Sequence, residues 1–339
     1  MPKQYATLKD VAKKAKTTAA TVSYILNGNK NRYISEDMRE RVLQAAKELN
    51  YVKSSAASSL RGKQRKMIAV LVPQFINQFF TQVVLAIEKV ADEYGYVLSI
   101  CNTFDDTERE KDVIQRMQQQ RMDGYIIIPT KAGAENTKQI RDIGIPLVIV
   151  DRSIEGVEKY NWVTTKNYQC SYVGVEYLIK KGHRKIAFIG WDSEIPDLIK
   201  RETAYRDAIK ENNINPSNIL VLNGIFTAEA GYDMTKEILL HHSDVTAIFY
   251  AYNIQAIGGI RYLRERKIIA GKDISVVLIG SPDWAVIGNY TRIDQRAFDL
   301  GTKAARLIFE VIYNKNSTDF GHIMQNCVLI EGDSVVDIK

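Results

Sequence analysis

The sequence predicts two parts of different fold class: an α-helical head at the N-terminus and a larger α/β body. Three observations support this division. The first 52 residues contain three short helical patterns, the chain from Met67 onward alternates apolar strand-like runs with amphipathic helical runs, and the two parts differ in charge. With 339 residues the chain is also too long for one ordinary core, because domains commonly contain roughly 100–200 residues.

The helices of the head have clear start and stop signals. Thr7 followed by Asp10 forms a capping-box pattern, and Thr18 and Ser35 are expected to cap a second and a third helix. Gly28 provides a left-handed stop for the second helix. Apolar residues recur at helical spacing in all three segments, which predicts one small shared core. They are Leu8, Val11, Ala12, Ala15, Val22, Ile25, Leu26, Met38, Val42, Ala45, Ala46 and Leu49.

Residues 53–65 read as a polar, small-residue-rich linker between the head (1–52) and the body (66–339). A helix of this length is marginal in water, so we expect it to become helical only when it docks on another surface.

The body shows seven apolar, β-branched runs separated by amphipathic helical stretches. Continuous apolar strands alternating with helices predict parallel sheets that are covered on both faces. Seven or more such units favour two doubly wound sheets over one. The runs are 68–72, 97–100, 125–128, 147–150, 186–189, 247–250 and 276–279, and the helical stretches are 83–94, 113–122, 173–181, 204–212, 234–240, 257–264 and 304–313.

Composition and motifs exclude several classes of protein. No apolar run approaches the roughly 18 residues that span a bilayer, and the N-terminus lacks a signal-peptide pattern, so we expect a cytoplasmic protein. The three cysteines are far apart and are expected to be reduced thiols. The sequence lacks dinucleotide, Walker, nucleophile-elbow and zinc-protease motifs, and its four histidines are scattered. We therefore expect no enzyme activity, no cofactor and no metal site.

The net charge of +6 is unevenly distributed. Residues 1–66 contain 15 Lys and Arg against 5 Asp and Glu, which leaves 31 basic and 35 acidic residues for the remainder. The head therefore carries +10 and the body −4. A basic head on a mildly acidic body indicates a polyanion partner for the head, although a merely solvated lysine-rich surface is the alternative.

Residues 7–27 have the anatomy of a helix-turn-helix: a helix, a turn of about three residues and a second helix with a polar outer face. The second helix would enter the major groove, while hydroxyls and backbone N–H groups would contact phosphates. The alternative is a helical pair in an ordinary bundle. The candidate DNA-contacting residues of this segment are Thr7, Thr17, Thr18, Ala19, Ala20, Thr21, Ser23, Tyr24 and Asn27.

Several segments, in order along the chain, resemble the lactose/galactose repressor family of bacterial transcription regulators. In the head they are 7–12, 21–23 and 26–28, and they continue through 39–42, 48–51, 56–61, 72–80, 182–190 and 274–277. The resemblance implies a sequence-specific regulator, mostly a repressor, that binds double-stranded operator DNA as a homodimer or tetramer. It also implies a sensor like periplasmic binding proteins, with two lobes joined by three crossovers, here 66–163 with 292–325 and 164–291 with 326–339.

The resemblance further implies paired hinge helices that push a leucine into the minor groove. By position this leucine is Leu60, with Ala57 beside it, and an apolar wedge of this kind bends the duplex. The chain departs from the family pattern at Lys16-Thr17-Thr18, where the family turn carries Gly-Val-Ser, and at Lys53-Ser54, where it carries Pro-Asn. We expect Lys53 to add a phosphate contact.

A small effector is expected in the cleft between the lobes, at the carboxyl ends of strands. The candidate residues by family position are Phe79, Phe80, Asp151, Arg201, Phe226, Tyr252, Asn253, Asp283 and Gln295. Each also has an ordinary structural reading: core packing for the phenylalanines, a helix cap for Asp151 and a surface ion pair for Arg201.

The identity of the effector is left open by departures from the sugar-binding pattern. Tyr252-Asn253, Gly280-Ser281-Pro282 and Lys166-Asn167 replace the residues usual in the family. A sugar or sugar derivative is the first expectation. The alternatives are an anionic or other non-sugar compound, for example a sugar phosphate because Lys166 and Arg201 add positive charge, and a lost effector. A transport-type solute-binding protein is the alternative function, and it would need a signal peptide and no head.

Overall fold

The computed structural model describes residues 5–28, 33–52, 64–314 and 320–338, and every structural statement below concerns these residues. The chain separates into two compact units, with the division between Arg65 and Lys66. Each unit is described by itself.

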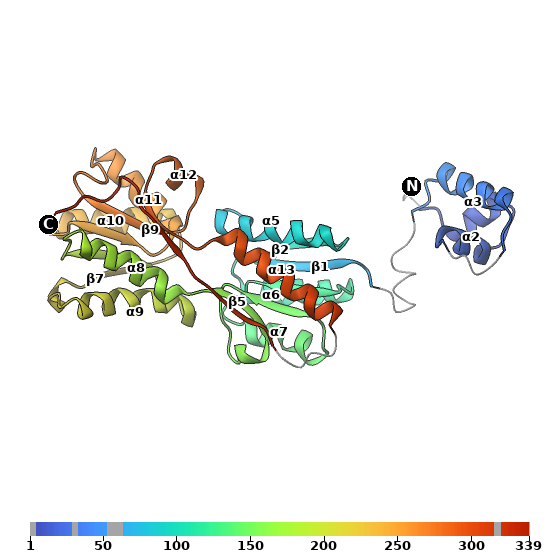
Figure 1. The fold of residues 1–339 in the computed structure, drawn as a ribbon, viewed down its shortest axis with the longest axis horizontal. Coiled ribbons are helices and arrows are strands. Elements are labelled where there is room, and N and C mark those ends of the chain that lie inside the picture. Colours follow the sequence, from blue (N-terminus) through green and yellow to red (C-terminus); the bar gives the residue numbers. More distant parts are fainter. Residues whose placement is uncertain (1–4, 29–32, 53–63, 315–319, 339) are drawn as a thin grey trace. The chain divides into compact units, whose positions relative to one another are not determined.

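The head contains three helices, α1 (Leu8–Lys14), α2 (Ala19–Leu26) and α3 (Glu36–Glu48) (Figure 1). The expected caps are confirmed. Asp10 accepts from the Thr7 N–H at 2.8 Å, Thr18 Oγ1 accepts from the Thr21 N–H at 3.2 Å, and Ser35 Oγ caps α3. The chain leaves α2 with φ +64° at Gly28, as the sequence predicts.

The three helices bury one apolar cluster, which confirms the predicted core of the head. Its buried members are Val11, Ala12, Ala15, Val22, Ile25, Val42 and Ala45. They come from the apolar stripes of the helices, and the outward positions are mainly polar, although Leu43 of α3 is 50% exposed.

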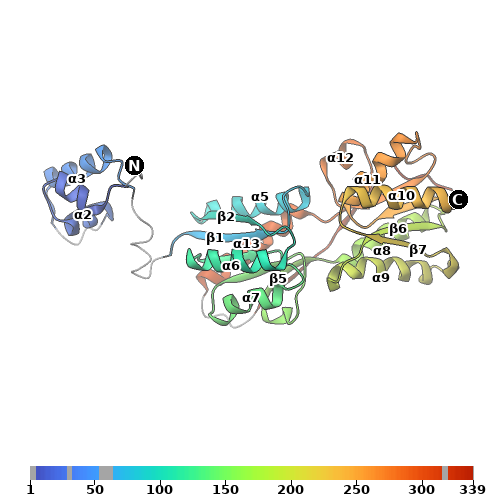
Figure 2. The ribbon, with the colours of Figure 1, turned by 180° about the vertical axis from the view of Figure 1, so that it is seen from behind.

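The first lobe of the sensor is a six-stranded parallel sheet in the order β11-β5-β4-β3-β1-β2. Helices α5 and α13 cover one face, and α6 and α7 cover the other (Figures 1 and 2). The strands are β1 (Met67–Val72), β2 (Val97–Asn102), β3 (Gly124–Ile127), β4 (Leu147–Val150), β5 (Asn161–Thr165) and β11 (His322–Gln325). The helices are α5 (Gln78–Glu93), α6 (Thr107–Gln119), α7 (Gly133–Asp142) and α13 (Ala297–Tyr313), with a 3₁₀ turn at Val157–Lys159.

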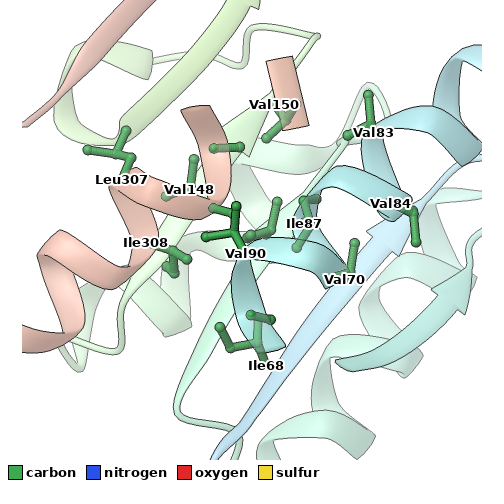
Figure 3. Close-up of a cluster of buried hydrophobic side chains, with 14 of the residues drawn as sticks. Ile68, Val70, Val83, Val84, Ile87, Val90, Val148, Val150, Leu307 and Ile308 are labelled. Carbon is green, nitrogen blue, oxygen red and sulfur yellow. The ribbon is translucent and has the colours of Figure 1, made fainter. Parts of the chain in front are cut away.

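Figure 3 shows how this lobe is held together. Ile68 and Val70 of β1 and Val148 and Val150 of β4 face the α5 and α13 side of the sheet, where they meet apolar residues of both helices. Burial of this kind stabilises by roughly 25 cal/mol per Å² of apolar surface. The packed layer fixes the carboxyl ends of the strands, which form the wall of the cleft.

The second lobe has the same architecture, with strand order β12-β10-β9-β8-β6-β7. Only β12 runs antiparallel to its neighbour. Helices α8 and α9 cover one face, and α10, α11 and α12 cover the other. The strands are β6 (Ile186–Trp191), β7 (Leu220–Gly224), β8 (Ala247–Tyr250), β9 (Ser275–Ile279), β10 (Thr291–Asp294) and β12 (Val328–Ile330). The helices are α8 (Asn167–Lys180), α9 (Pro196–Glu211), α10 (Ala228–His241), α11 (Asn253–Glu265) and α12 (Asp283–Ile287), with a 3₁₀ turn at Pro216–Asn218.

Three segments pass between the lobes, at β5–α8, β10–α13 and β11–β12 (Figure 1). Strand β10 belongs to the second sheet, so the predicted return to the first lobe at residue 292 is corrected to a point after Asp294. Gln325, which is buried at the start of the third crossover, forms hydrogen bonds with the other two. Its Nε2 donates to the carbonyls of Gln295 and Arg296 at 2.8 Å, and the backbone carbonyl of Gln325 accepts from the Lys166 N–H at 2.9 Å.

Candidate functional site

The candidate DNA-binding surface is the outer face of α2 with the turn before it. Ala20 and Asn27 are exposed, and Ser23 and Tyr24 are half-buried. Asn27 Nδ2 donates to the Ser23 carbonyl at 2.6 Å and to Ser23 Oγ at 3.0 Å, so these two side chains are held in fixed orientations. A short, exposed alanine followed one turn later by an aromatic side chain is compatible with close approach to base edges.

The hydroxyls at the start of α2 are already arranged around the helix terminus. Thr18 Oγ1 lies 2.9 Å from Thr21 Oγ1 and caps the helix. The first N–H groups of a helix attract anions, so a phosphate would be bound here by backbone as well as by side chains. Thr7 is exposed at the start of α1, and Thr17 is half-buried in the turn.

Two residues in this surface differ from expectation. Ala19 packs against the core of the head, so it is a poorer candidate for a base contact than its neighbour Ala20. Lys16 adopts φ +52°, a left-handed conformation that costs a non-glycine residue roughly 1–2 kcal/mol. The expected hinge contacts Lys53, Ala57 and Leu60 lie outside the described residues and remain predictions.

In the sensor, a small cavity of about 30 Å³ lies between the lobes at the carboxyl ends of the strands. Eight of the nine predicted effector residues line it, from both lobes. They are Phe79, Phe80, Asp151, Arg201, Phe226, Tyr252, Asn253 and Gln295. The sequence positions therefore converge on one place, although contact with an effector remains a proposal. The ninth residue, Asp283, lies exposed at the start of α12, outside the cavity lining, and its contact with an effector remains a prediction.

Asp151 combines deep burial, a left-handed backbone conformation and an unsatisfied carboxyl oxygen. It is only 5% exposed and adopts φ +67° directly after β4, and its Oδ1 has no hydrogen-bond partner among the described residues. Burial raises the pKa of this carboxyl, and the nearby guanidinium groups of Arg152 and Arg201 oppose that rise. A buried carboxylate oxygen without a partner is costly, so it favours a ligand that donates a hydrogen bond.

Arg201 approaches from α9 in the second lobe and is fixed by its neighbours. Its Nε donates to Asn167 Oδ1 at 2.8 Å, and one terminal nitrogen donates to the Ala251 carbonyl at 2.5 Å. The guanidinium also lies over the Tyr252 ring, 4.6 Å from its centroid. A guanidinium held in this way can present its remaining N–H groups to a ligand in a fixed direction.

Aromatic rings form the second-lobe wall. Trp191, Phe226 and Tyr252 lie with ring centroids 5.0–5.9 Å apart in pairs. Phe79 and Phe80 add an edge-to-face pair on the first lobe, 5.4 Å between centroids. Aromatic faces pack against the C–H side of a sugar ring while amide and charged groups bind its hydroxyls.

Sequence reasoning missed five residues of the lining. Arg152 follows Asp151 directly, and Trp191 ends β6, so a search of all strand ends would have found both. The Arg152 guanidinium lies over the Trp191 ring across the cleft, 5.5 Å from its centroid, and is paired with Asp105 at 2.6 Å. The others are Asn77, Leu198 and Ile279. Lys166, expected to add charge, does not line the cavity.

Direct bonds join the lobes around the cavity. On one side Asp197 Oδ2 accepts from the Ser153 N–H at 2.9 Å, and Lys131 pairs with Glu194 at 3.0 Å. On the other side Asn253 Nδ2 donates to Asn77 Oδ1 at 3.1 Å. We call these contacts the interlobe latches. They hold the lobes close together, and the cavity has room for about two water molecules, each of which needs roughly 10–15 Å³ of such space.

Other kinds of site find no support in the described part of the chain. Within it, no group of three or more His, Cys, Asp or Glu residues is placed to hold a metal ion. No helix there is long and apolar enough to cross a membrane.

Comparison with known proteins matches both parts of the chain. Residues 7–54 match the family described as bacterial regulatory proteins, lacI family, and residues 175–335 match a periplasmic binding protein-like domain. The ribose operon repressor of Halalkalibacterium halodurans is 31% identical over 314 residues, 91% of each chain. The HTH-type transcriptional regulator RegA of Clostridium acetobutylicum is 31% identical over 334 residues, 97% of this chain and 99% of that protein.

Solved structures confirm the fold. The lac repressor dimer bound to operator and the anti-inducer ONPF aligns with TM-score 0.83 at 24% identity, covering 98% of this chain and 100% of that one. A LacI family regulator of Enterococcus faecium with bound ribose aligns with TM-score 0.73 at 23% identity, covering 80% and 100%. The predicted helical head and two-sheet sensor are thus confirmed. The chain belongs to the lacI family of bacterial regulatory proteins and is a DNA-binding transcription regulator.

Proposed function

We propose that the chain is a repressor whose operator affinity is controlled by a neutral sugar bound between the lobes. The observation that supports this most directly is a pair of unsatisfied polar atoms in one cavity. Asp151 Oδ1 and Gln295 Nε2 are both buried and lack partners among the described residues. One is an acceptor and the other is a donor, so a hydroxylated ligand that both donates and accepts would satisfy them.

The charges of the cavity favour a neutral ligand over a phosphate. Asp151 balances Arg201, and Arg152 is already paired with Asp105 through two hydrogen bonds of 2.6 and 3.2 Å. A phosphate would approach the unpartnered Asp151 carboxyl, and among the described lining residues Arg201 alone would have to offset the repulsion. The sugar phosphate that the sequence left open is therefore the weaker candidate.

Control of DNA binding would follow from the interlobe latches. A ligand changes an equilibrium only through unequal affinity for two states. A sugar ring does not fit in about 30 Å³, so its binding would require the latches to rearrange and the lobes to shift. The first lobe fixes the chain where the hinge begins, because Asp123 Oδ2 accepts from the N–H groups of Lys66 and Met67. A shift of that lobe would thus move the base of the hinge.

A homodimer is the proposed assembly, because two heads read a two-fold operator. Exposed apolar side chains on both lobes support it. Val97 is 65% exposed on the edge strand β2, and Ile287 is 85% exposed on α12. Further exposed apolar residues are Ile76, Leu85, Ile100 and Phe104 in the first lobe and Ile225, Ile257 and Val286 in the second.

A thermal-shift screen of the full chain against neutral sugars and their phosphates tests the effector. A ligand that binds only the folded state raises the melting temperature. The same compounds are then added to operator-binding titrations. We expect neutral sugars to raise the melting temperature and change operator affinity, and Asp151→Ala to abolish both effects. Binding by phosphorylated sugars alone, or a shift that persists in Asp151→Ala, contradicts the proposal.

A further inference from the structure

A second, larger chamber opens beside the small cavity of the sensor. Its volume is about 310 Å³, within the range of roughly 300–1,000 Å³ that is usual for small-molecule sites. It lies where the start of α5 faces the loop after β9 and the crossover into α13. We call it the outer chamber, and the small cavity the inner cavity. The outer chamber is lined by Gln78, Phe79, Gln82, Asn253, Gly280, Ser281, Pro282, Asp294, Gln295, Arg296, Ala297, Phe298 and Asp299.

The two spaces share a wall made of Phe79, Asn253 and Gln295. Gln295 is 7% exposed, and its Nε2 has no partner among the described residues. An amide on a shared wall is placed to bond a ligand that occupies both spaces. A buried donor without a partner is unusual, so its position is informative about a ligand.

The lining has the chemistry of a carbohydrate subsite. Phe298 is 40% exposed and offers an apolar face, and Gln82 adds a side-chain amide to the lining. Ser281 Oγ accepts from Arg292 Nε at 3.0 Å, which fixes the loop after β9. A ring that packs on an aromatic face while amides bind its hydroxyls suits this set of groups.

The charges of the outer chamber disfavour an anion. Asp294 and Asp299 outnumber Arg296, and Arg296 is paired with Asp299. Arg296 also has φ +54°, and it is held by its N–H bond to Asp294 Oδ1 at 2.7 Å and by Gln325. A left-handed non-glycine residue costs free energy, and such residues concentrate at functional sites.

We propose that the effector has two neutral carbohydrate units, as in a disaccharide or a substituted glycoside. One ring would bind Asp151 and Arg201 in the inner cavity, and the other would occupy the outer chamber. This inference rests on the proposed function, since it assumes a sugar in the inner cavity. The outer chamber already has space, whereas the inner cavity must widen, so a two-unit ligand gains contacts that a single ring lacks.

Isothermal titration of the full chain tests this. The probes are common neutral disaccharides, including cellobiose, maltose and sucrose, and their constituent monosaccharides. Gln82→Trp should narrow the outer chamber, and Gln82 does not line the inner cavity. Gln82→Ala is the matched control that leaves the chamber open. Melting temperatures of both variants, and their operator affinity without sugar, verify that each is folded.

We expect at least one disaccharide to bind ten-fold or more tightly than either of its units. Gln82→Trp should remove that advantage and leave monosaccharide affinity within about two-fold, while Gln82→Ala should retain most of it. Equal affinity for a disaccharide and its units, or equal behaviour of the two variants, overturns the two-unit effector alone. Failure of every neutral sugar to bind at millimolar concentration overturns both this inference and the proposed function.

Discussion

The head and the sensor use opposite physical means to prepare a binding surface. The head exposes its candidate contacts on one helix, and their polar groups are already bonded locally, as in the Thr18 cap and the Asn27–Ser23 pair. The sensor buries its candidate contacts and leaves Asp151 Oδ1 and Gln295 Nε2 unsatisfied. A charged surface attracts a polyanion at little cost to folding, whereas a selective pocket for a small molecule retains unpaired groups at some cost in stability.

Salt should separate the two regions most strongly. The +10 charge of the head predicts that operator affinity falls by roughly 10³–10⁵-fold between about 50 and 200 mM salt if about 6–10 phosphates are contacted. Sugar affinity should hardly change, because a neutral ligand releases few ions. Fluorescence anisotropy and calorimetry over a salt series measure the two quantities. A flat operator curve would falsify the electrostatic role of the head.

Arg201→Ala should uncouple the sensor from the head. Effector coupling is typically worth about 5- to 150-fold in DNA affinity, and we expect this factor to fall to about one because the ligand loses a fixed guanidinium. Operator affinity without effector should persist, since the head is a separate unit. Operator titrations with and without the effector measure the factor. Arg206→Ala, on the same helix but paired at the surface with Glu202, is the control and should keep it.

Tyr24 should influence which bases are preferred, whereas Thr18 should influence affinity alone. Tyr24 lies on the outward side of α2, while Thr18 caps its N-terminus and would meet the backbone of DNA. A lost base contact costs about 1–3 kcal/mol of discrimination. Binding-site selection with Tyr24→Ala and Thr18→Ala compares them. An unchanged selected site for Tyr24→Ala means that its assigned role is wrong.

Asp151→Asn should stabilise the free sensor while it weakens sugar binding. The pKa of Asp151 is raised in the folded state, so folding favours the neutral form that asparagine imitates. The stability advantage of the variant should be absent below the ordinary pKa of 3.8, should grow as pH rises from there to the raised pKa and should stay constant above it. Denaturant unfolding at several pH values measures it. A destabilised variant at neutral pH means that the ionised carboxylate is the form the fold prefers.

Lys16→Gly should have the smallest effect. It relieves a left-handed lysine at φ +52°, worth up to about 1 kcal/mol after the extra chain entropy of glycine is subtracted. The same change removes one positive charge, so the salt slope should become slightly shallower. Thermal unfolding of the head and the salt series measure both. Lys14→Gly, inside α1, is the contrasting change and should destabilise.

The sequence predicted the head better than the body for a physical reason. Caps, turns and helix faces within residues 7–49 are set by neighbours a few positions apart, and the predicted Thr7, Thr18 and Ser35 caps are confirmed. In the body, long apolar runs identified the central strands. The sequence did not predict seven elements of the body, because several are short or half-exposed and lack a strong hydrophobic period. They are strands β5, β7, β10, β11 and β12 and helices α7 and α12.

The cleft was predicted through family positions, and residue patterns alone would not have assembled it. Strand ends such as Asp151 and Tyr252 are about 100 positions apart and meet only because two sheets face each other. Trp191 was not predicted to line the cavity, although it ends a strand, because an aromatic residue is usually part of a core. The outer chamber depends on the crossover at Asp294–Ala297, whose path no local pattern encodes.

Because the chain crosses between the lobes three times, both lobes are completed much later in biosynthesis than the head. The first sheet gains its last strand, β11, only at residues 322–325, and the second gains β12 at 328–330, whereas the helices of the head are complete by residue 48. At ribosomal rates of about 5–20 residues per second, the two events are separated by roughly tens of seconds. A newly made head would thus be folded and strongly basic while its sensor is still unfinished. Its early encounters with DNA would be those of a single head that no effector controls, and regulation would begin only after β11 and β12 have been made.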